Sequence, residues 1–363
     1  MRILAIDTSC DDTSVAISDD LNILANVFWS KMKLHSKWGG VVPAEARRQH
    51  KEFLGPAIDE VCKQAKLSLN KIDIFAVTQG PGLAIALEAG IAKAKELANE
   101  HKKPLIAVNH MIGHIYSNLT QDSNGKPYAG LDKFEFPLLA LTISGGHTDL
   151  YLMKGHLEFE HLGQTLDDAV GEAFDKIGRM LGMGFPAGAE IEKSAQEGNP
   201  STFQFPRPLS NSQDYNWSYS GLKTAVLYEV QKIIGDYKVK QGKGQFKFID
   251  ISDKLDKETI NDIAASFQEA AIESLLIKVK RAVEAYKPKM FVVGGGVIAN
   301  TTLRRSLEDT LFLTNTPLYY PKPIWLCTDN AAMIATAAYF YAKENKFVKN
   351  SRELDRIPNL KIS

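Results

Sequence analysis

Two stretches of this chain repeat one pattern, and the repeat limits what the chain can fold into. Leu4-Ala-Ile-Asp-Thr-Ser9 aligns with Leu139-Ala-Leu-Thr-Ile-Ser144, and each stretch is followed by a polar loop and a second apolar segment. Short apolar runs bounded by turn residues are typical of buried strands. We therefore predict a duplicated α/β architecture in which each half begins with strand, polar loop and strand, and the two loops face a shared cleft.

The composition restricts the class of protein. A length of 363 residues is typical of about two domains. The 43 basic and 43 acidic residues cancel, so any contact with nucleic acid has to come from a local patch. Cys10, Cys62 and Cys327 are far apart, which excludes a disulfide framework and favours a reducing cytosol. No apolar run reaches the roughly 20 residues of a membrane helix, and the strand pattern from Arg2 leaves no room for a signal peptide.

Strand and helix patterns alternate along the rest of the chain. Apolar residues that recur every three to four positions predict helices, and short apolar runs between turns predict strands. We expect strands at 24–29, 72–78, 104–108 and 290–293, and helices at 45–66, 83–99, 263–285, 302–310 and 331–343, with a further helix ending at 180. Gly55-Pro56 is expected to break the first helix. The polar segment from Asn345 is expected to be only partly ordered.

His110 and His114 follow an apolar strand pattern and are four positions apart. On a helix this spacing places both imidazoles on one face, where they can bind one metal ion. The alternative is a pair of packed or exposed histidines without a ligand. Met111 stands where a zinc protease of the HExxH type has its glutamate, so that chemistry is disfavoured.

Polar and glycine-rich loops follow several of the expected strands. Gly145 and Gly146 would allow backbone N–H groups to approach a phosphate closely. Gly294-Gly-Gly296 lies between a strand and a helix and would make a nucleotide cradle, although neither the dinucleotide fingerprint nor a P-loop is present. The loop Thr8–Thr13 faces a phosphate or a metal, or it only satisfies its own turn hydrogen bonds.

Three further features each have a plain structural interpretation. Asp329 directly precedes an alanine-rich helix and is a candidate N-cap. Asp175 reads as a surface carboxylate on a helix. The lysines between Lys238 and Lys247 favour a solvated surface loop, with an RNA contact as the alternative.

Taken together, these segments resemble one family over nearly the whole chain. The motifs that carry the resemblance are Asp7-Thr-Ser-Cys-Asp-Asp-Thr-Ser14, Gly39-Gly-Val-Val-Pro43, Gly80-Pro-Gly82, His110-Met-Ile-Gly-His114, Ser144-Gly-Gly-His-Thr148, Gly171-Glu-Ala-Phe-Asp-Lys176, Ser220-Gly-Leu-Lys-Thr224, Gly294-Gly-Gly-Val-Ile-Ala-Asn300 and Cys327-Thr-Asp-Asn330. They occur in the order typical of the TsaD family of tRNA threonylcarbamoyladenosine biosynthesis, once described as O-sialoglycoprotein endopeptidases. With histidine at position 147, where archaeal and eukaryotic relatives usually differ, the chain resembles the bacterial or organellar branch of that family.

The resemblance implies an actin-like fold of the sugar-kinase and heat-shock ATPase superfamily, with two ribonuclease-H-like α/β lobes around a cleft. We expect residues 1–115 and 331–363 in the first lobe and 116–330 in the second. It also implies one divalent transition metal, usually iron(II) with zinc as the alternative, bound by His110, His114 and Asp329. The positions carried over for the adenylate ligand are Ile143, Ser144, Gly145, Gly146, His147, Asp175, Gly188 and Asn300.

The activity that the resemblance implies is transfer of the threonylcarbamoyl group from threonylcarbamoyl-AMP to N6 of adenosine 37, in tRNAs that read codons beginning with adenine. Asp11 or Asp12 is our candidate for the general base, chosen by position. The implied partners are tRNA, an upstream threonylcarbamoyl-AMP synthase, a TsaB-like paralogue and a TsaE-like ATPase, in the cytoplasm and without a membrane. The alanine-rich helix 83–99 is the surface we expect to meet the paralogue.

Two other functions remain open at this stage. An ATP-dependent small-molecule kinase can have the same fold, but it does not need the two histidines and the aspartate. A non-catalytic scaffold that stabilises a catalytic paralogue is the second alternative, and retention of all three metal-ligand candidates argues against it. The chain also departs from the family pattern at Asp12, where glutamate is common, at Ala187, Ala189, Glu192 and Ala331, and in the length of the basic stretch 238–257.

Overall fold

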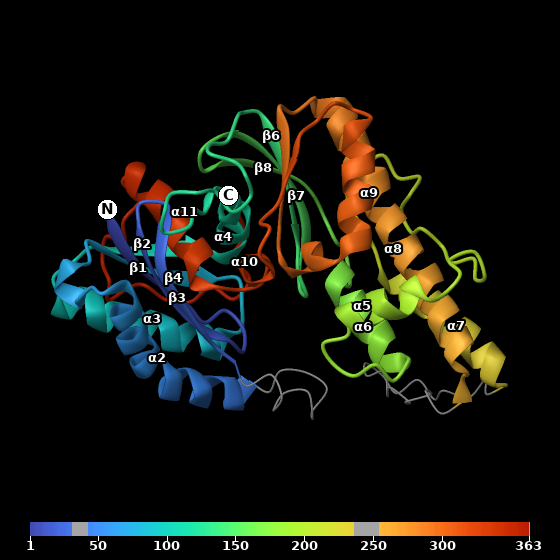
Figure 1. Ribbon diagram of the computed structural model, residues 1–363, viewed down its shortest axis with the longest axis horizontal. Coiled ribbons are helices and arrows are strands. Elements are labelled where there is room, and N and C mark those ends of the chain that lie inside the picture. The colour runs from blue at the N-terminus through green and yellow to red at the C-terminus, as the bar shows by residue number, and fades with distance from the viewer. Residues whose placement is uncertain (31–42, 236–253, 363) are drawn as a thin grey trace.

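The computed structural model describes residues 1–30, 43–235 and 254–362, which form two mixed sheets with helices around and between them (Figure 1). Most of the Gly39–Pro43 motif and of the basic stretch 238–257 lies outside the described residues.

The first sheet has five strands in the order β3-β2-β1-β4-β5. Their bounds are β1 Arg2–Asp7, β2 Thr13–Asp19, β3 Asn22–Trp29, β4 Ile74–Gly80 and β5 Leu105–Asn109. Strands β1 to β3 form an antiparallel meander, and β4 and β5 continue the sheet in parallel with β1. The parallel strands are reached through helices α2 (Pro43–Ala65) and α3 (Ala84–Glu100), because a parallel connection needs a crossover.

The second sheet repeats this topology, with the strand order β10-β9-β6-β7-β8. Its strands are β6 Leu138–Ile143, β7 Thr148–Gly155, β8 Glu158–Gln164, β9 Met290–Gly294 and β10 Leu318–Tyr319. Again an antiparallel meander comes first and two parallel strands follow. The duplication that the short repeat at Leu4 and Leu139 predicts is therefore confirmed.

Helices α4 (His110–Tyr116) and α11 (Ala331–Lys343) lie between the two sheets (Figure 1). Side chains alternate across each strand. Ile3 and Ala5 of β1 share one buried cluster with Leu138 and Ala140 of β6 and with residues of α4 and α11, whereas Leu4 and Ile6 face α2 and α3. Every residue of α4 is buried.

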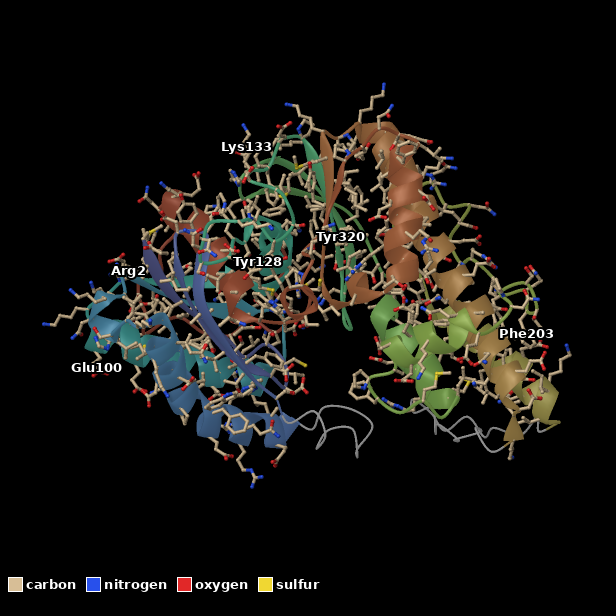
Figure 2. The ribbon with its side chains drawn as sticks, in the orientation of Figure 1. Arg2, Glu100, Tyr128, Lys133, Phe203 and Tyr320 are labelled. Atoms are coloured by element: carbon tan, nitrogen blue, oxygen red, sulfur yellow. The ribbon has the colours of Figure 1, made fainter. Side chains whose placement is uncertain are left out.

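The remaining helices pack mainly around the second sheet. They are α5 Val170–Met180, α6 Gly188–Gln196, α7 Ser220–Ile234, α8 Lys257–Tyr286 and α9 Thr301–Phe312, together with the short α10 Ile324–Cys327 and the 3-10 turns η1 Leu69–Lys71, η2 Ser117–Leu119 and η4 Gly296–Ala299. Figure 2 shows Tyr128 beside α10, where its ring meets that of Trp325 edge-on at 5.5 Å between centroids.

Two local expectations are wrong. Helix α2 continues through Pro56 without a break. Residues 345–362, which we name the return segment, are not loose but run back along the first sheet. Val348 N–H donates to the carbonyl of Leu105, and Ile357 N–H donates to that of Gln79. The end of the described chain therefore lies close to α4 (Figure 1).

Among the described helices, none combines the length and the apolar character that crossing a bilayer requires.

Candidate metal centre and nucleotide loops

Helix α4 presents the two histidines that the sequence predicts as metal ligands. Asn109 caps it, because its Oδ1 accepts hydrogen bonds from the backbone N–H of Met111 at 2.9 Å and of Ile112 at 3.4 Å. His110 and His114 then lie on one face of the helix, with ring centroids 4.8 Å apart. His114 is fully buried and His110 nearly so.

Asp329 completes the cluster from the loop between α10 and α11. Its Oδ1 lies 3.2 Å from Nε2 of His110 and 3.2 Å from Nε2 of His114. The three ligand atoms lie within 4.8 Å of one another. Two imidazole nitrogens and a carboxylate oxygen are a donor set that iron(II) and zinc accept in proteins. The residues therefore fit a metal ion, and Asn330, not Asp329, caps α11 through Met333 N–H.

The charges in this cluster depend on one another. Burial lowers the pKa of His110, but the carboxylates of Asp329 and Asp7 outweigh it and raise that pKa to about 10. Burial dominates at His114 and lowers its pKa. Burial raises the pKa of Asp329, yet the charge of His110 and hydrogen bonds from both histidines hold it well below its usual range.

Asp7 is a residue that sequence reasoning did not assign to the site. It ends β1, is 2% exposed, and its Oδ1 lies 3.6 Å from Nδ1 of His110. Thr78 Oγ1 donates to Asp7 at 2.7 Å and Ser9 Oγ donates at 3.3 Å, so the carboxylate is fixed. A carboxylate behind a metal-binding histidine commonly orients its ring. The signal available in the sequence was an acid at the end of a buried strand.

The two candidate bases lie in the loop after β1. Burial of Asp12 is the main cause that raises its pKa to about 7, partly opposed by a hydrogen bond from Ser30. Asp11, Asp329 and Asp7 add to the shift through their charges. Asp12 is therefore a carboxylate that can take up a proton near neutral pH, which suits a general base.

The loop between β6 and β7 presents backbone to open space. Ser144 Oγ accepts from His147 N–H at 3.2 Å and from Gly146 N–H at 3.4 Å, which holds the turn. A Cβ atom built at Gly145 or Gly146 would meet nothing within 4 Å. A ligand can therefore approach both glycines. The side chain of Ile143, by contrast, is buried in the core.

The other predicted nucleotide residues are engaged within the protein. Asp175 Oδ1 accepts from Ala187 N–H at 2.8 Å, directly before α6 begins at Gly188. Burial raises the pKa of Asp175, and the backbone hydrogen bond from Ala187 opposes the rise. Asn300 caps α9 through Leu303 N–H at 2.8 Å and donates from Nδ2 to Gln268 at 2.8 Å.

The glycines after β9 have a packing role that the sequence alone did not reveal. A Cβ atom at Gly294 would lie 2.2 Å from the carbonyl oxygen of His114, and one at Gly295 would lie 2.3 Å from that of Ile143. Gly295 also has a φ of +102°, which favours glycine. Gly294 therefore lets the end of β9 lie against α4, and Gly295 lets the following turn lie against β6, whereas a Cβ atom at Gly296 would be in ordinary contact with Thr328 at 3.8 Å.

Lysines from two of the motifs that carry the family resemblance contact one carboxylate. Asp168 accepts from Lys176 of α5 at 2.6 Å and from Lys223 of α7 at 2.5 Å. The start of α5 lies against the loop at Ser144, because a Cβ atom at Gly171 would lie 2.5 Å from the Ser144 carbonyl oxygen.

Comparison with known proteins identifies the family. The family model for TsaD, tRNA N6-adenosine threonylcarbamoyltransferase, matches residues 22–336. The protein of that name from Thermosipho africanus is 44% identical over 362 residues, which cover 100% of both chains. This chain belongs to the tRNA N6-adenosine threonylcarbamoyltransferase family. The resemblance based on the motifs is thereby confirmed, and members of this threonylcarbamoyltransferase family are transferases that modify tRNA.

Solved structures of distant proteins share the fold of this threonylcarbamoyltransferase family member. HypF from T. kodakarensis is 13% identical with a TM-score of 0.61, over 94% of this chain and 48% of that one. Component A of the (R)-2-hydroxyglutaryl-CoA dehydratase from Acidaminococcus fermentans is 13% identical with a TM-score of 0.52, over 94% and 99%. The expected actin-like ATPase fold is confirmed.

Proposed function

We propose that this protein transfers the threonylcarbamoyl group from threonylcarbamoyl-AMP to N6 of adenosine 37, in tRNAs that read codons beginning with adenine. The observation that carries the proposal is the convergence of His110, His114 and Asp329 in a chain that matches the threonylcarbamoyltransferase family over its full length. Neither a kinase nor a scaffold needs that buried donor set.

The reaction forms a bond between N6 of adenosine and the carbamoyl carbon, and it breaks the bond from that carbon to the phosphate oxygen of AMP. The electron pair leaves with AMP. A metal ion held by the two histidines and Asp329, iron(II) in our proposal, would act as a Lewis acid at the carbamoyl carbonyl. Asp12 accepts the amine proton, since its pKa of about 7 allows proton uptake near neutral pH.

The nucleotide end of the donor binds along the open backbone of Gly145 and Gly146, where no other described part of the protein lies in the way. Asp175 and Asn300 contribute by fixing the starts of α6 and α9. We retain Ile143, Ser144, His147 and Gly188 as parts of this proposed adenylate site.

The lobe boundaries and partners are part of the same proposal. Residues 1–115 with 331–363 form the first lobe and 116–330 the second, a division supported by the contacts of α11 with β1 and β2 of the first sheet. The protein works in the cytoplasm with tRNA, a threonylcarbamoyl-AMP synthase, a TsaB-like paralogue and a TsaE-like ATPase. The alanine side of α3 is not available to the paralogue, because Ala86, Ala94 and Ala98 are buried.

Reconstitution tests the proposal. The protein is incubated with threonine, bicarbonate, ATP, tRNA, the synthase and the two helper proteins, and the tRNA nucleosides are analysed by mass spectrometry. We expect threonylcarbamoyladenosine, and about one bound transition-metal ion per chain. His110→Ala should lose both, whereas His101→Ala, which removes a histidine that contacts Asn70 away from the site, should lose neither. Full metal occupancy in His110→Ala would overturn the metal assignment, and the absence of modified nucleoside with wild-type protein would overturn the reaction.

A further inference from the structure

A small cavity lies beside helix α4, which carries the two histidines. Its volume is about 170 Å³. Met111, which follows His110 on α4, and His147 both line it. At about 30 Å³ for each water, the space holds roughly six waters, and it is too small for a nucleotide.

One wall of the cavity is a polar patch on strands β7 and β8. Asp149 pairs in register with Gln164, and Tyr151 pairs with His161, which places all four side chains on one face of the hairpin. His161 Nε2 lies 3.1 Å from Asp149 Oδ1, and its ring stacks on Tyr151 with centroids 4.9 Å apart. The wall is therefore preorganised by contacts within the hairpin.

The opposite wall is the return segment. Gly82 N–H donates to the carbonyl of Pro358 at 3.0 Å. Asn109 Nδ2 donates to the carbonyl of Leu360 at 3.4 Å. Ile362 is 9% exposed and belongs to the cluster between the sheets. These contacts hold the segment on both sides of Lys361, and they tie it to the residue that caps the metal helix.

The return segment brings the one cation of this cavity. Lys361 and Asn359 line it, together with Pro81, Leu360 and Ile362. Within residues 1–30, 43–235 and 254–362, no carboxylate lies within ion-pair distance of the Lys361 ammonium. Lys361 is an exposed residue that lines the cavity, together with the amide groups of Gln164 and Asn359, the carboxylate of Asp149 and an apolar surface formed by Met111 and Leu360.

We infer that this cavity binds the amino-acid part of the donor, with Lys361 as the partner of its carboxylate. The inference rests on the proposed function, because it names where the threonyl group of the donor lies. The carboxylate binds Lys361 and lies away from Asp149, since like charges repel. Asn359 and Gln164 can hydrogen-bond the threonyl hydroxyl, and Met111 and Leu360 meet its methyl group. A ligand that lacks the threonyl hydroxyl and methyl groups cannot make those contacts.

Binding of N-carbamoyl-L-threonine to the full-length, metal-loaded protein tests this assignment. Titration calorimetry should give about tenfold weaker binding for Lys361→Met, which keeps the length of the side chain and removes the charge. Lys361→Arg should stay within about threefold of wild type. Lys349→Met is the matched control, because Lys349 is an exposed lysine of the same segment outside the cavity. AMP should bind all four proteins equally, and N-carbamoylglycine should bind wild type more weakly than the threonine compound.

Steady-state kinetics provide the second measurement. Lys361→Met should raise the KM for threonylcarbamoyl-AMP about tenfold with little change in kcat. Undetectable binding of N-carbamoyl-L-threonine to wild type, equal binding by Lys361→Met, or an equal loss of AMP affinity would each overturn the inference. The reaction can fail separately: if the probe binds in a Lys361-dependent manner but no tRNA is modified, the proposed function is wrong and the cavity assignment stands. If tRNA is modified and Lys361→Met keeps the wild-type KM, only the cavity assignment is wrong.

Discussion

At the scale of single residues, the main result is the division of tasks between Asp329 and Asn330. The sequence alone made Asp329 a plausible helix cap, because aspartate is favoured before an alanine-rich helix. Asn330 performs that task through Met333 N–H at 2.9 Å, and Asp329 faces the two histidines instead. Neighbouring residues of similar capping preference cannot be separated by sequence pattern, since the backbone direction at the helix start decides which one caps.

Asp329→Asn and Asn330→Ala should therefore have opposite effects. Asp329→Asn removes the anionic ligand but not the cap, so we expect loss of metal and a fall in transfer by orders of magnitude, with little change in Tm. Asn330→Ala should destabilise the protein by about 1 kcal/mol and keep its metal. Metal content by mass spectrometry and thermal unfolding distinguish the two. A stable Asp329→Asn protein with normal metal content and activity would contradict this division.

Glycine substitutions separate binding from packing. Gly145→Val places a side chain into open space, so the protein should fold, and AMP should bind at least about tenfold more weakly. Gly295→Val puts a side chain against the Ile143 carbonyl at a positive φ, so it should destabilise the fold. Thermal unfolding and AMP titration measure both effects. Unchanged AMP affinity in a folded Gly145→Val protein would argue against the phosphate loop.

At the scale of elements, tertiary packing determined two features that local sequence preference predicted wrongly, namely the continuation of α2 and the order of the return segment. Most helices and strands follow from apolar periodicity, and α11 has the predicted bounds Ala331–Lys343. Pro56 was expected to end a helix because it lacks an N–H donor, at a cost of about 3 kcal/mol. Helix α2 continues because Ala57, Ile58 and Val61 beyond it are buried against the sheet. The return segment was missed for a related reason: its order depends on backbone hydrogen bonds to β4 and β5, which leave no periodic signal in the sequence.

The start of α7 allows a test by pH. Burial raises the pKa of Asp167, but hydrogen bonds from Ser218, Ser220 and two backbone N–H groups hold it below its usual value of 3.8. A lowered native pKa stabilises the fold above the unfolded pKa, and this contribution is lost as pH falls through the native value. Asp167→Asn should therefore be less stable than wild type at about pH 7, and the difference should shrink towards about pH 3.

Urea unfolding at both pH values measures that difference in free energy. Asp132→Asn, which changes an exposed carboxylate in the segment before β6, serves as the control and should show a small and nearly constant difference. A deficit for Asp167→Asn that is the same at both pH values would mean that the carboxylate charge is not what holds the start of α7.

At the scale of the whole molecule, the sequence repeat predicted the topology better than it predicted the site. The orders β3-β2-β1-β4-β5 and β8-β7-β6-β9-β10 are the same arrangement used twice. The short match between residues 4–9 and 139–144 was enough to predict the topology, because the alternation of buried residues determines which strands pair. The cavity at Lys361 could not be foreseen, since its walls come from residues about 200 positions apart in the chain, and only the return segment brings them together.

Dependence on other proteins is a prediction about the whole molecule. The described residues contain no P-loop motif, and we propose that separate proteins supply the donor and reset the enzyme. The isolated protein with preformed threonylcarbamoyl-AMP and tRNA should therefore give about one turnover, and the TsaB-like and TsaE-like helpers should extend it. Time courses of modified nucleoside per enzyme measure this. Sustained turnover by the isolated protein would show that the helpers are not required.

The order in which a ribosome releases the metal donors follows from their positions. His114 and Asp329 are separated by 215 residues, so at ordinary elongation rates the second emerges about 10–40 s after the first. During that interval the nascent chain holds the two imidazoles of the candidate site without the Asp329 carboxylate, and two imidazoles alone bind divalent metals weakly and unselectively. Under the proposed metal assignment, the ion is therefore acquired only by the finished chain, where the supply of metal in the cell favours iron or zinc.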